Sequence, residues 1–254
     1  MKIDDSVALV TGGAGCLGRS IAETLYGKNA KVISADICHE HTNNSLDCYD
    51  KYILDCYDKY IFDVTDPNDT KQTICKIIDK YGKIDILVNC AGRIVSTPFV
   101  NIMSPDSMML PYEQFREEVT LNLDSVFIVT SSVIEQMILR RTKGCIINIS
   151  SISARGNEGQ TSYSAAKAAV EAMTITWSKE LGRMGIRCNA IAPGFVGTES
   201  TYRALNDSHI KHIISSTPLH RLGTPEEISS AIVFLIENDF INGEILNING
   251  GLTF

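Results

Sequence analysis

The sequence predicts a doubly wound α/β fold, in which a parallel, seven-stranded sheet carries helices on both faces. Two observations support this prediction. Short apolar runs recur without polar alternation, as strands buried on both faces require, and helix-length segments separate them. A glycine-rich turn also joins the first run to the first helix. We expect strands at 7–11, 31–36, 60–64, 84–92, 144–150, 187–194 and 243–251, and helices at about 18–27, 66–81, 112–140, 162–184 and 225–238.

Composition narrows the possible classes of protein. The chain has 254 residues, of which 44% are hydrophobic, and no linker interrupts it, so we expect a single domain over 1–254. The net charge of −7 comes without a basic block, which argues against a nucleic-acid partner. No apolar run approaches the roughly 18 residues that cross a bilayer, and the first run is too short for a signal peptide. We therefore expect a cytoplasmic protein without a membrane partner.

The eight cysteines indicate reduced thiols rather than disulfides or a zinc site. None is paired in a C-x-x-C spacing, and several lie inside apolar runs. His209, His212 and His220 are not at a convincing metal-binding spacing. We expect no metal.

A tandem octamer precedes the third expected strand. DCYDKYIL at 47–54 is followed by DCYDKYIF at 55–62, and the repeat occurs only twice. Solenoid repeats are far longer, so we interpret this one as a local duplication in a tolerant surface segment. Only the second copy leads into the third strand, and the first copy should lengthen the connection before it.

The turn after the first strand is suited to a phosphate. Gly12, Gly13, Gly15 and Gly18 lie between a strand and a helix. In such a turn, backbone N–H groups and the N-terminus of a helix can face a pyrophosphate. Because tight turns need glycine anyway, the surrounding strand and helix make this signal specific.

Asp36, about 18 residues beyond Gly18, ends the second strand. A carboxylate there accepts hydrogen bonds from the adenosine ribose hydroxyls and repels a 2′-phosphate. The neighbouring Ile37 and Cys38, and Cys16 in the turn, provide no positive charge for NADP. We therefore expect NAD rather than NADP as the cofactor.

A tyrosine and a lysine lie four residues apart on the helix expected at 162–184. Tyr163 and Lys167 therefore share one helical face. A free phenol has a pKa of about 10, too high for a base at neutral pH, and a nearby ammonium lowers it. Tyr163 is thus a candidate general acid in ketone reduction and general base in alcohol oxidation.

Together, these motifs resemble the short-chain dehydrogenase/reductase family over nearly the whole chain, which implies a Rossmann fold. The TGxxxGxG pattern is matched at Thr11, Gly12 and Gly18 but departs at Cys16, and the NNAG pattern departs at Cys90. The resemblance implies that Asn122 holds a helix irregularity and a water that relays protons to Lys167. It also implies cofactor contacts from Gly12, Gly15, Cys16, Leu17, Gly18, Asp36, Ile37, Asp63, Val64, Asn89, Ala91, Gly92, Tyr163, Lys167, Pro193, Gly194, Val196 and Thr198.

Two serines compete for the remaining catalytic position. Keeping the strand IINIS in register with the family places Ser151 there, whereas counting back from Tyr163 places Ser150 there. A one-residue slip would turn every side chain of a buried strand, whereas loops absorb deletions. We favour Ser151 as the donor of a hydrogen bond to the substrate oxygen and keep Ser150 as the alternative.

Cys16 is the departure with the most direct consequence for the cofactor. A small side chain in the first turn of the helix can point away from the phosphates, so we expect weakened or slightly shifted binding rather than loss. As an alternative, a helix N-terminus lowers the pKa of a thiol, which would make Cys16 a redox sensor.

Two segments are expected to shape the substrate pocket. One is the segment at about 195–217, where insertions often form a lid. The other, 93–111, carries Met103, Met108, Met109 and Leu110, which either line an apolar cleft or, as we favour, pack under the loop. Arg93 either meets an anionic group or, as we favour, is solvated.

The sequence thus predicts an oxidoreductase that moves a hydride between NAD(H) and a secondary alcohol or ketone. Sugar-like polyols, hydroxyacyl compounds and steroid-like alcohols all remain open as substrates. The alternative is a nucleotide-sensing protein that binds NAD(H) with little or no turnover. By resemblance, we also expect a homodimer or homotetramer that pairs through the helices at 112–140 and 162–184.

Overall fold

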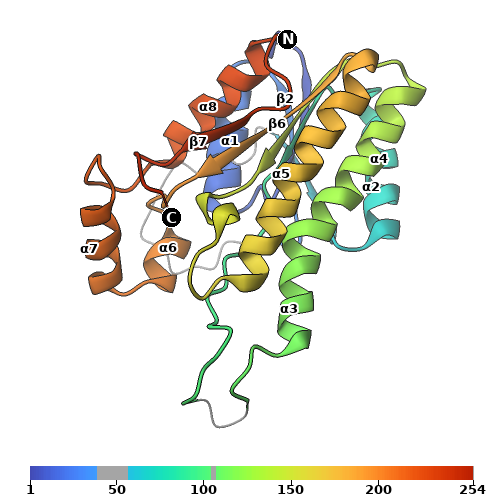
Figure 1. Ribbon diagram of the computed structural model, residues 1–254. Helices are drawn as coiled ribbons and strands as arrows, with labels where there is room; N and C mark the ends of the chain where they lie inside the picture. Colours follow the sequence, from blue (N-terminus) through green and yellow to red (C-terminus); the bar gives the residue numbers. More distant parts are fainter. Residues whose placement is uncertain (39–56, 104–106, 254) are drawn as a thin grey trace.

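A seven-stranded parallel sheet forms the centre of the molecule, as expected (Figure 1). The computed structural model describes residues 1–38, 57–103 and 107–253. The strand order is β3-β2-β1-β4-β5-β6-β7, so the winding reverses between β1 and β4. In doubly wound folds, ligands bind at the carboxyl ends of the strands beside this reversal. The strands are β1 (Val7–Thr11), β2 (Lys31–Asp36), β3 (Asp58–Ile61), β4 (Ile86–Asn89), β5 (Gly144–Ile149), β6 (Ile186–Pro193) and β7 (Ile245–Ile248).

Helices cover both faces of the sheet. Ala8 and Val10 of β1 pack in the core with α1 (Cys16–Tyr26) and α8 (Pro225–Glu237). Val7 and Leu9 pack in the opposite core with α2 (Pro67–Tyr81), α4 (Ser125–Leu139) and α5 (Thr161–Leu181). The shorter helices are α3 (Tyr112–Val119), α6 (Glu199–Ala204) and α7 (Asp207–Ser216).

Local sequence signals explain where several helices begin and end. Asp66 caps α2 by accepting hydrogen bonds from two backbone N–H groups, and Pro67 occupies the first turn. The same helix ends at Gly82, whose φ of +78° is the left-handed conformation that favours glycine. Thr224 and Glu227 form a reciprocal capping box at the start of α8.

The structure corrects several expected bounds. The third strand was expected at 60–64, but β3 spans Asp58–Ile61 and lies in the second octamer copy; the first copy, 47–54, lies outside the described residues. The fourth strand ends at Asn89 because the next residues turn toward β1. The expected helix over 112–140 is interrupted by a π-helical turn, Thr120–Asp124.

The two segments expected near the substrate have well-defined structures. Residues 199–216 hold two helices, α6 and α7, where the sequence predicted only a lid-like insertion. In the segment 93–111, Val100 and Met109 form an antiparallel bridge. Met103, Met108 and Met109 are exposed, so the expectation that they pack under the loop is wrong. Across the described residues, no helix is long and apolar enough to cross a membrane.

Candidate active site

Two glycines of the first turn are required by close backbone contacts. Gly12 has a φ of +65°, and a Cβ there would lie 2.8 Å from the Cα of Ala91. A Cβ on Gly18 would lie 2.1 Å from the carbonyl oxygen of Gly12. The N-cap residue of α1 is Gly15, which has no side chain to make a capping hydrogen bond. These features leave a backbone cradle at the positive end of a helix, which fits an anionic phosphate.

Asp36 lies beside this cradle, at the carboxyl end of β2. Its Oδ2 accepts a hydrogen bond of 3.0 Å from the backbone N–H of Ala14, and its Oδ1 accepts one of 2.8 Å from that of Ile37. The carboxylate is therefore held against the glycine turn. Ile37 itself is exposed, and Leu17 packs partly against the core below α1.

Cys16 is the first residue of α1 and is half-buried. Burial raises the pKa of its thiol, and the nearby backbone of Glu199 acts in the opposite direction. The alternative that the pKa of this thiol is lowered is wrong, because desolvation of the thiolate is the largest influence on that pKa and raises it. The contact with Glu199 also joins the glycine turn to α6, a link that sequence reasoning missed.

The segment after β4 is held by Thr11 rather than by Asn89. The Thr11 hydroxyl accepts hydrogen bonds from the backbone N–H groups of Cys90 (3.1 Å) and Ala91 (3.2 Å). The Asn89 amide instead lies in the core, where it donates to Asn148 and to a threonine of α4, both at 2.8 Å. The Asn89 amide group is therefore engaged in the core, and a cofactor contact from this residue stays a prediction.

The resemblance assigns Asp63 and Val64 to the adenine end of the cofactor and residues 193–198 to its nicotinamide end. The exposed Asp63 accepts a hydrogen bond from the Thr65 N–H, and Val64 is buried.

At the nicotinamide end of the expected cofactor site, Pro193 is the last residue of β6, and a Cβ on Gly194 would lie 2.9 Å from the Cα of Asn249. The Val196 carbonyl accepts a 2.7 Å hydrogen bond from the Thr201 hydroxyl, and Thr198 caps α6.

Ser151, not Ser150, faces the tyrosine of α5. The Ser151 hydroxyl lies close enough to the phenol of Tyr163 to oppose the rise of its pKa, and it accepts a hydrogen bond of 3.1 Å from the Ser153 N–H. The Ser150 hydroxyl turns the other way and lies 2.8 Å from a carboxylate oxygen of Glu171. This geometry agrees with the choice made by keeping the strand in register.

Lys167 lies beneath the same phenol. Its Nζ is 5.6 Å from the centroid of the Tyr163 ring and donates a 2.8 Å hydrogen bond to the carbonyl of Ile149. Burial lowers the pKa of Lys167 to about 8 and raises the pKa of Tyr163 to about 12. In the free chain, burial therefore outweighs the lowering that the sequence predicted for the pKa of Tyr163.

Asn122 occupies the π-helical turn and is fully buried. Its amide donates 3.0 Å hydrogen bonds to the carbonyls of Glu118 and Arg93, and its Oδ1 accepts from the Arg93 N–H at 3.1 Å. A Cβ on Gly92 would lie 2.8 Å from Asn122 Oδ1 and 3.6 Å from Lys167 Nζ. These three residues therefore meet, and the irregular turn is where the resemblance placed it.

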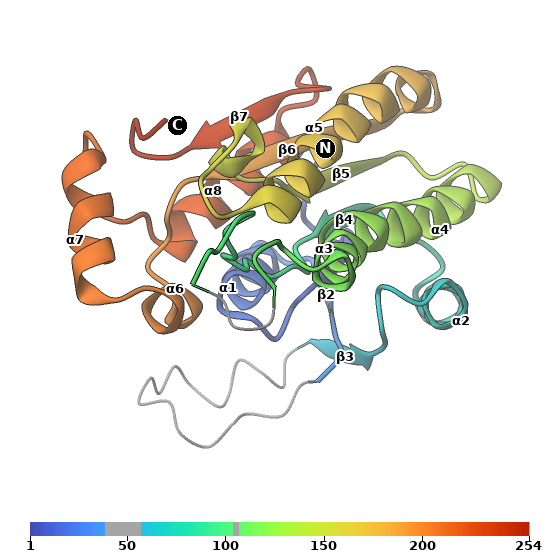
Figure 2. The ribbon, with the colours of Figure 1, turned by 60° about the horizontal axis from the view of Figure 1, so that its bottom comes forward.

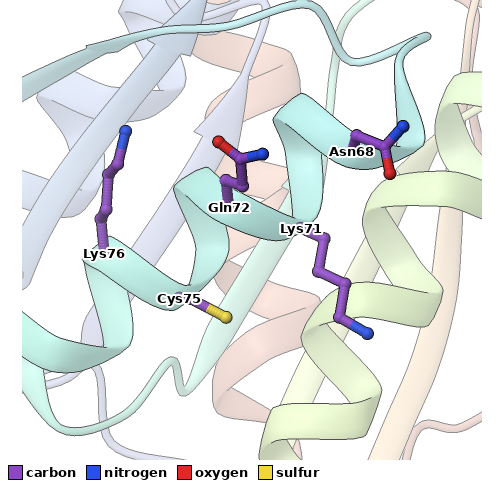
Figure 3. Close-up of a pocket in the computed structure, with 5 residues that line it drawn as sticks. All are labelled: Asn68, Lys71, Gln72, Cys75 and Lys76. Atoms are coloured by element: carbon purple, nitrogen blue, oxygen red, sulfur yellow. The ribbon is translucent and has the colours of Figure 1, made fainter.

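Surface depressions elsewhere lack this chemistry. One lies on α2 and is lined by Asn68, Lys71, Gln72, Cys75 and Lys76 (Figure 3), away from the carboxyl ends of the strands. In the part of the chain that the structure describes, no group of three His, Cys, Asp or Glu side chains could hold a metal ion. At neutral pH, the Tyr163 site holds a protonated phenol beside an ammonium and a serine hydroxyl, which suits proton donation to an oxygen.

Comparisons with known proteins place this geometry among reductases and dehydrogenases. A family model described as enoyl-(acyl carrier protein) reductase matches residues 12–253. The chain is similar to 3-oxoacyl-(acyl-carrier-protein) reductases from Thermotoga maritima (37% identity) and Escherichia coli (34%), over 99% of each chain. It also resembles the ligand-free structure of the aldohexose dehydrogenase of Thermoplasma acidophilum, with a TM-score of 0.82 and 28% identity over 98% of this chain and 94% of that one.

Proposed function

The chain belongs to the short-chain dehydrogenase/reductase family, and on this premise we propose that it transfers a hydride between NAD(H) and a ketone or secondary alcohol. The observation that carries the proposal is the proximity of the Ser151 hydroxyl to the Tyr163 phenol, with Lys167 Nζ 5.6 Å from the centre of the same ring. The cradle formed by Gly12 and Gly18 fits the pyrophosphate of the dinucleotide.

The chain's own residues handle the proton. When bound, the nicotinamide supplies or accepts the hydride. Tyr163 donates its phenolic proton to the substrate oxygen in reduction and removes it in oxidation. Ser151 donates a hydrogen bond to the same oxygen as negative charge develops there. The ammonium of Lys167 favours the phenolate that forms as the proton leaves. Asn122 positions the backbone at Arg93 beside Lys167.

Asp36 supports NAD(H) as the preferred cofactor. Its carboxylate is fixed by two backbone N–H groups beside the glycine turn, where the adenosine ribose would lie. A negative charge in that position accepts hydrogen bonds from ribose hydroxyls and repels a 2′-phosphate. The adjacent Ile37 and Cys38 bring no compensating positive charge.

We also propose that residues 195–217, including α6 and α7, cover the substrate. The contact between Cys16 and the backbone of Glu199 supports this placement, because it joins α6 to the cofactor cradle. We propose that 1–254 is a single domain, since both hydrophobic cores pack on one sheet. Exposed apolar side chains on α4 and α5, Phe127 and Ile175 among them, support pairing into a dimer or tetramer.

A substrate panel with one variant tests the function. The panel comprises 3-oxoacyl thioesters with NADH or NADPH, and aldohexoses with the oxidised cofactors. We expect turnover of at least one compound, with NADH and NAD⁺ preferred. In Tyr163→Phe, the rate on the best substrate should fall about 100- to 10,000-fold, because the proton donor is lost. The binding of NADH, followed by its fluorescence, is the control for an intact fold.

Two results would contradict the proposal. Unchanged turnover in Tyr163→Phe would exclude this residue as the proton donor. Binding of NADH without turnover of any panel member would favour the nucleotide-sensing alternative.

A further inference from the structure

Three consecutive residues at the carboxyl end of β5 contact the helix that carries Tyr163. The Ile149 carbonyl accepts the hydrogen bond from Lys167 Nζ. The Ser151 hydroxyl lies close to the Tyr163 phenol, and Ser150, between the two in the chain, is 2% exposed. Because α5 packs along β6, the neighbour of β5 (Figure 2), these residues link the helix to the adjoining strand.

The Ser150 side chain is directed at a carboxylate of the same helix. Its hydroxyl donates a 2.8 Å hydrogen bond to Oε1 of Glu171 and lies 3.4 Å from the carbonyl oxygen of Lys167. The Ser150 N–H donates a 2.7 Å hydrogen bond to the Ile191 carbonyl in β6, which fixes the serine to the sheet. Hydrogen bonds to a carboxylate are stronger than those between neutral groups, so this contact holds the helix firmly against the end of β5.

Glu171 lies on the stripe of α5 that carries Tyr163 and Lys167. The three residues are spaced four apart, so their side chains lie on one face of the helix. Tyr163 and Glu171 are separated by about 12 Å along the helix axis, since each residue of an α-helix adds about 1.5 Å. The neighbouring Ser150 and Ser151 therefore contact α5 at two separate points, one on each side of the lysine.

We propose that Ser150 and Glu171 form a clamp that positions Tyr163 against Ser151. The inference rests on the proposed function, in which Tyr163 and Ser151 act on the same substrate oxygen. Ser150 and Glu171 are positioning residues, because their hydrogen bond joins the strand to the helix and does not involve the reacting atoms. Without the clamp, α5 can shift along the sheet and carry the phenol out of line with the substrate oxygen. A displacement of about 1 Å can lower a rate about 100-fold.

The kinetics of a small set of variants test the clamp. Ser150→Ala and Glu171→Leu should each lower kcat about tenfold with a much smaller change in KM, because the substrate still binds but meets a displaced proton donor. Glu171→Gln should keep most of the wild-type kcat, since its amide oxygen still accepts the hydrogen bond. The double variant Ser150→Ala/Glu171→Leu should be no slower than the slower single variant, because the same hydrogen bond is lost in each. Glu180→Leu is the matched control, because Glu180 is exposed on the same helix.

A spectroscopic measurement without substrate separates this inference from the proposed function. In protein labelled with fluorotyrosine, the fluorine NMR resonance that Tyr163→Phe removes reports on the surroundings of Tyr163. This resonance should move in Ser150→Ala and Glu171→Leu and keep its wild-type position in Glu171→Gln and Glu180→Leu. If this pattern holds but no ketone or alcohol is turned over, the proposed function fails and the clamp stands.

Three results would overturn the clamp. A wild-type kcat and an unmoved Tyr163 resonance in Ser150→Ala would show that the helix does not need this contact. Losses of kcat that multiply in the double variant would show that Ser150 and Glu171 act independently. A loss in Ser150→Ala as large as that in Tyr163→Phe, with the resonance unmoved, would place the Ser150 hydroxyl on the substrate instead.

Discussion

Lys167 is a charged residue in a place that disfavours charge. Its side chain is buried, and the Ile149 carbonyl is the hydrogen-bond acceptor for its Nζ. Burial lowers the pKa of Lys167 from 10.5 to about 8. Between these two values, the unfolded chain binds a proton that the folded chain does not bind. Stability from this residue therefore increases as the pH rises through that window, and the ammonium is most unfavourable below about 8.

This sign gives a prediction that needs no substrate. Urea denaturation should show that the free energy of unfolding of the wild-type protein increases relative to that of Lys167→Met between about pH 7.5 and pH 10. The wild-type protein therefore gains stability relative to the variant as the pH rises. Tyr163 is present in both proteins, so its titration largely cancels. Lys179→Met is the matched control, since Lys179 lies exposed on the same helix. A wild-type advantage that does not change with pH would exclude the proposed burial of the ammonium.

The sequence identified the residue types at the site but not their electrostatics. The spacing of Tyr163 and Lys167 followed from helical geometry, and keeping the buried strand in register selected Ser151 over Ser150. The predicted directions of the pKa shifts of Tyr163 and Cys16 were wrong. Both pKa values are raised, because segments distant in sequence bury the two side chains. Glu199, for example, contacts Cys16 across more than half of the chain. Spacing alone contains no information about that desolvation.

At the scale of elements, the glycine turn and α1 form one unit. Gly18 has no room for a side chain, whereas a Cβ on Gly15 would find only the Gly12 carbonyl oxygen, at 3.3 Å. Gly15 also has a φ of −70° and a ψ of 159°, which any residue adopts. The two positions therefore offer a matched pair of substitutions within one turn.

Gly18→Ala should weaken NADH binding more than tenfold, because its methyl group would force the turn and the N-terminus of α1 apart. Gly15→Ala should have a clearly smaller effect. Fluorescence titration of NADH measures both affinities, and circular dichroism checks that the helices are retained. Equal losses in the two variants would show that the cradle does not depend on the close approach of Gly18 to Gly12.

Elements buried on both faces were predictable from composition and periodicity, and elements shaped by local irregularity were not predictable in that way. The observed bounds of β1 and β2 match the expected ranges, because a continuous apolar run of this length indicates a strand that is buried on both faces of a parallel sheet. By contrast, the π-helical turn around Asn122 was predicted only through the family resemblance, because it depends on hydrogen bonds to Glu118 and Arg93 that composition and periodicity do not indicate. The two short helices after β6 were missed because the segment mixes polar and apolar residues.

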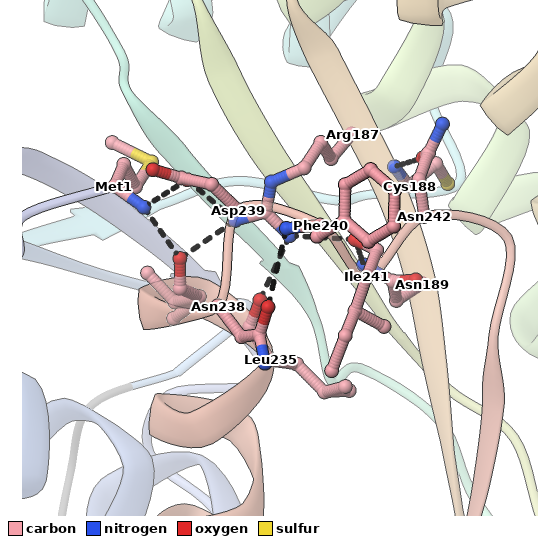
Figure 4. A network of polar contacts seen from close by, with 11 residues as sticks. Met1, Arg187, Cys188, Asn189, Leu235, Asn238, Asp239, Phe240, Ile241 and Asn242 are labelled. Atoms are coloured by element: carbon pink, nitrogen blue, oxygen red, sulfur yellow. Dashed lines mark hydrogen bonds and ion pairs between the residues drawn. The ribbon is translucent and has the colours of Figure 1, made fainter.

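At the scale of the whole molecule, one arginine connects β6 with the far end of α8 (Figure 4). Arg187 donates hydrogen bonds of 2.8 Å to the Leu235 carbonyl, 2.6 Å to the Ile236 carbonyl and 2.9 Å to the Ile241 carbonyl. A cation at the carboxyl end of a helix also interacts favourably with the helix dipole. Because α8 packs against α1 in one core, this contact supports the helix that begins at the cofactor cradle.

Arg187→Met should therefore lower the free energy of unfolding by about 2–5 kcal/mol, because it keeps the apolar stem but leaves buried carbonyls without donors. Urea denaturation measures this loss. Lys71→Met is the control: its exposed ammonium lies 3.7 Å from Glu135, and surface pairs contribute less than about 1 kcal/mol. Arg187 lies at the amino end of β6, away from the site, so NADH affinity should stay at the wild-type value while the protein is folded. A loss of affinity without a loss of stability would mean that α8 transmits a local distortion to α1 rather than supporting the fold as a whole.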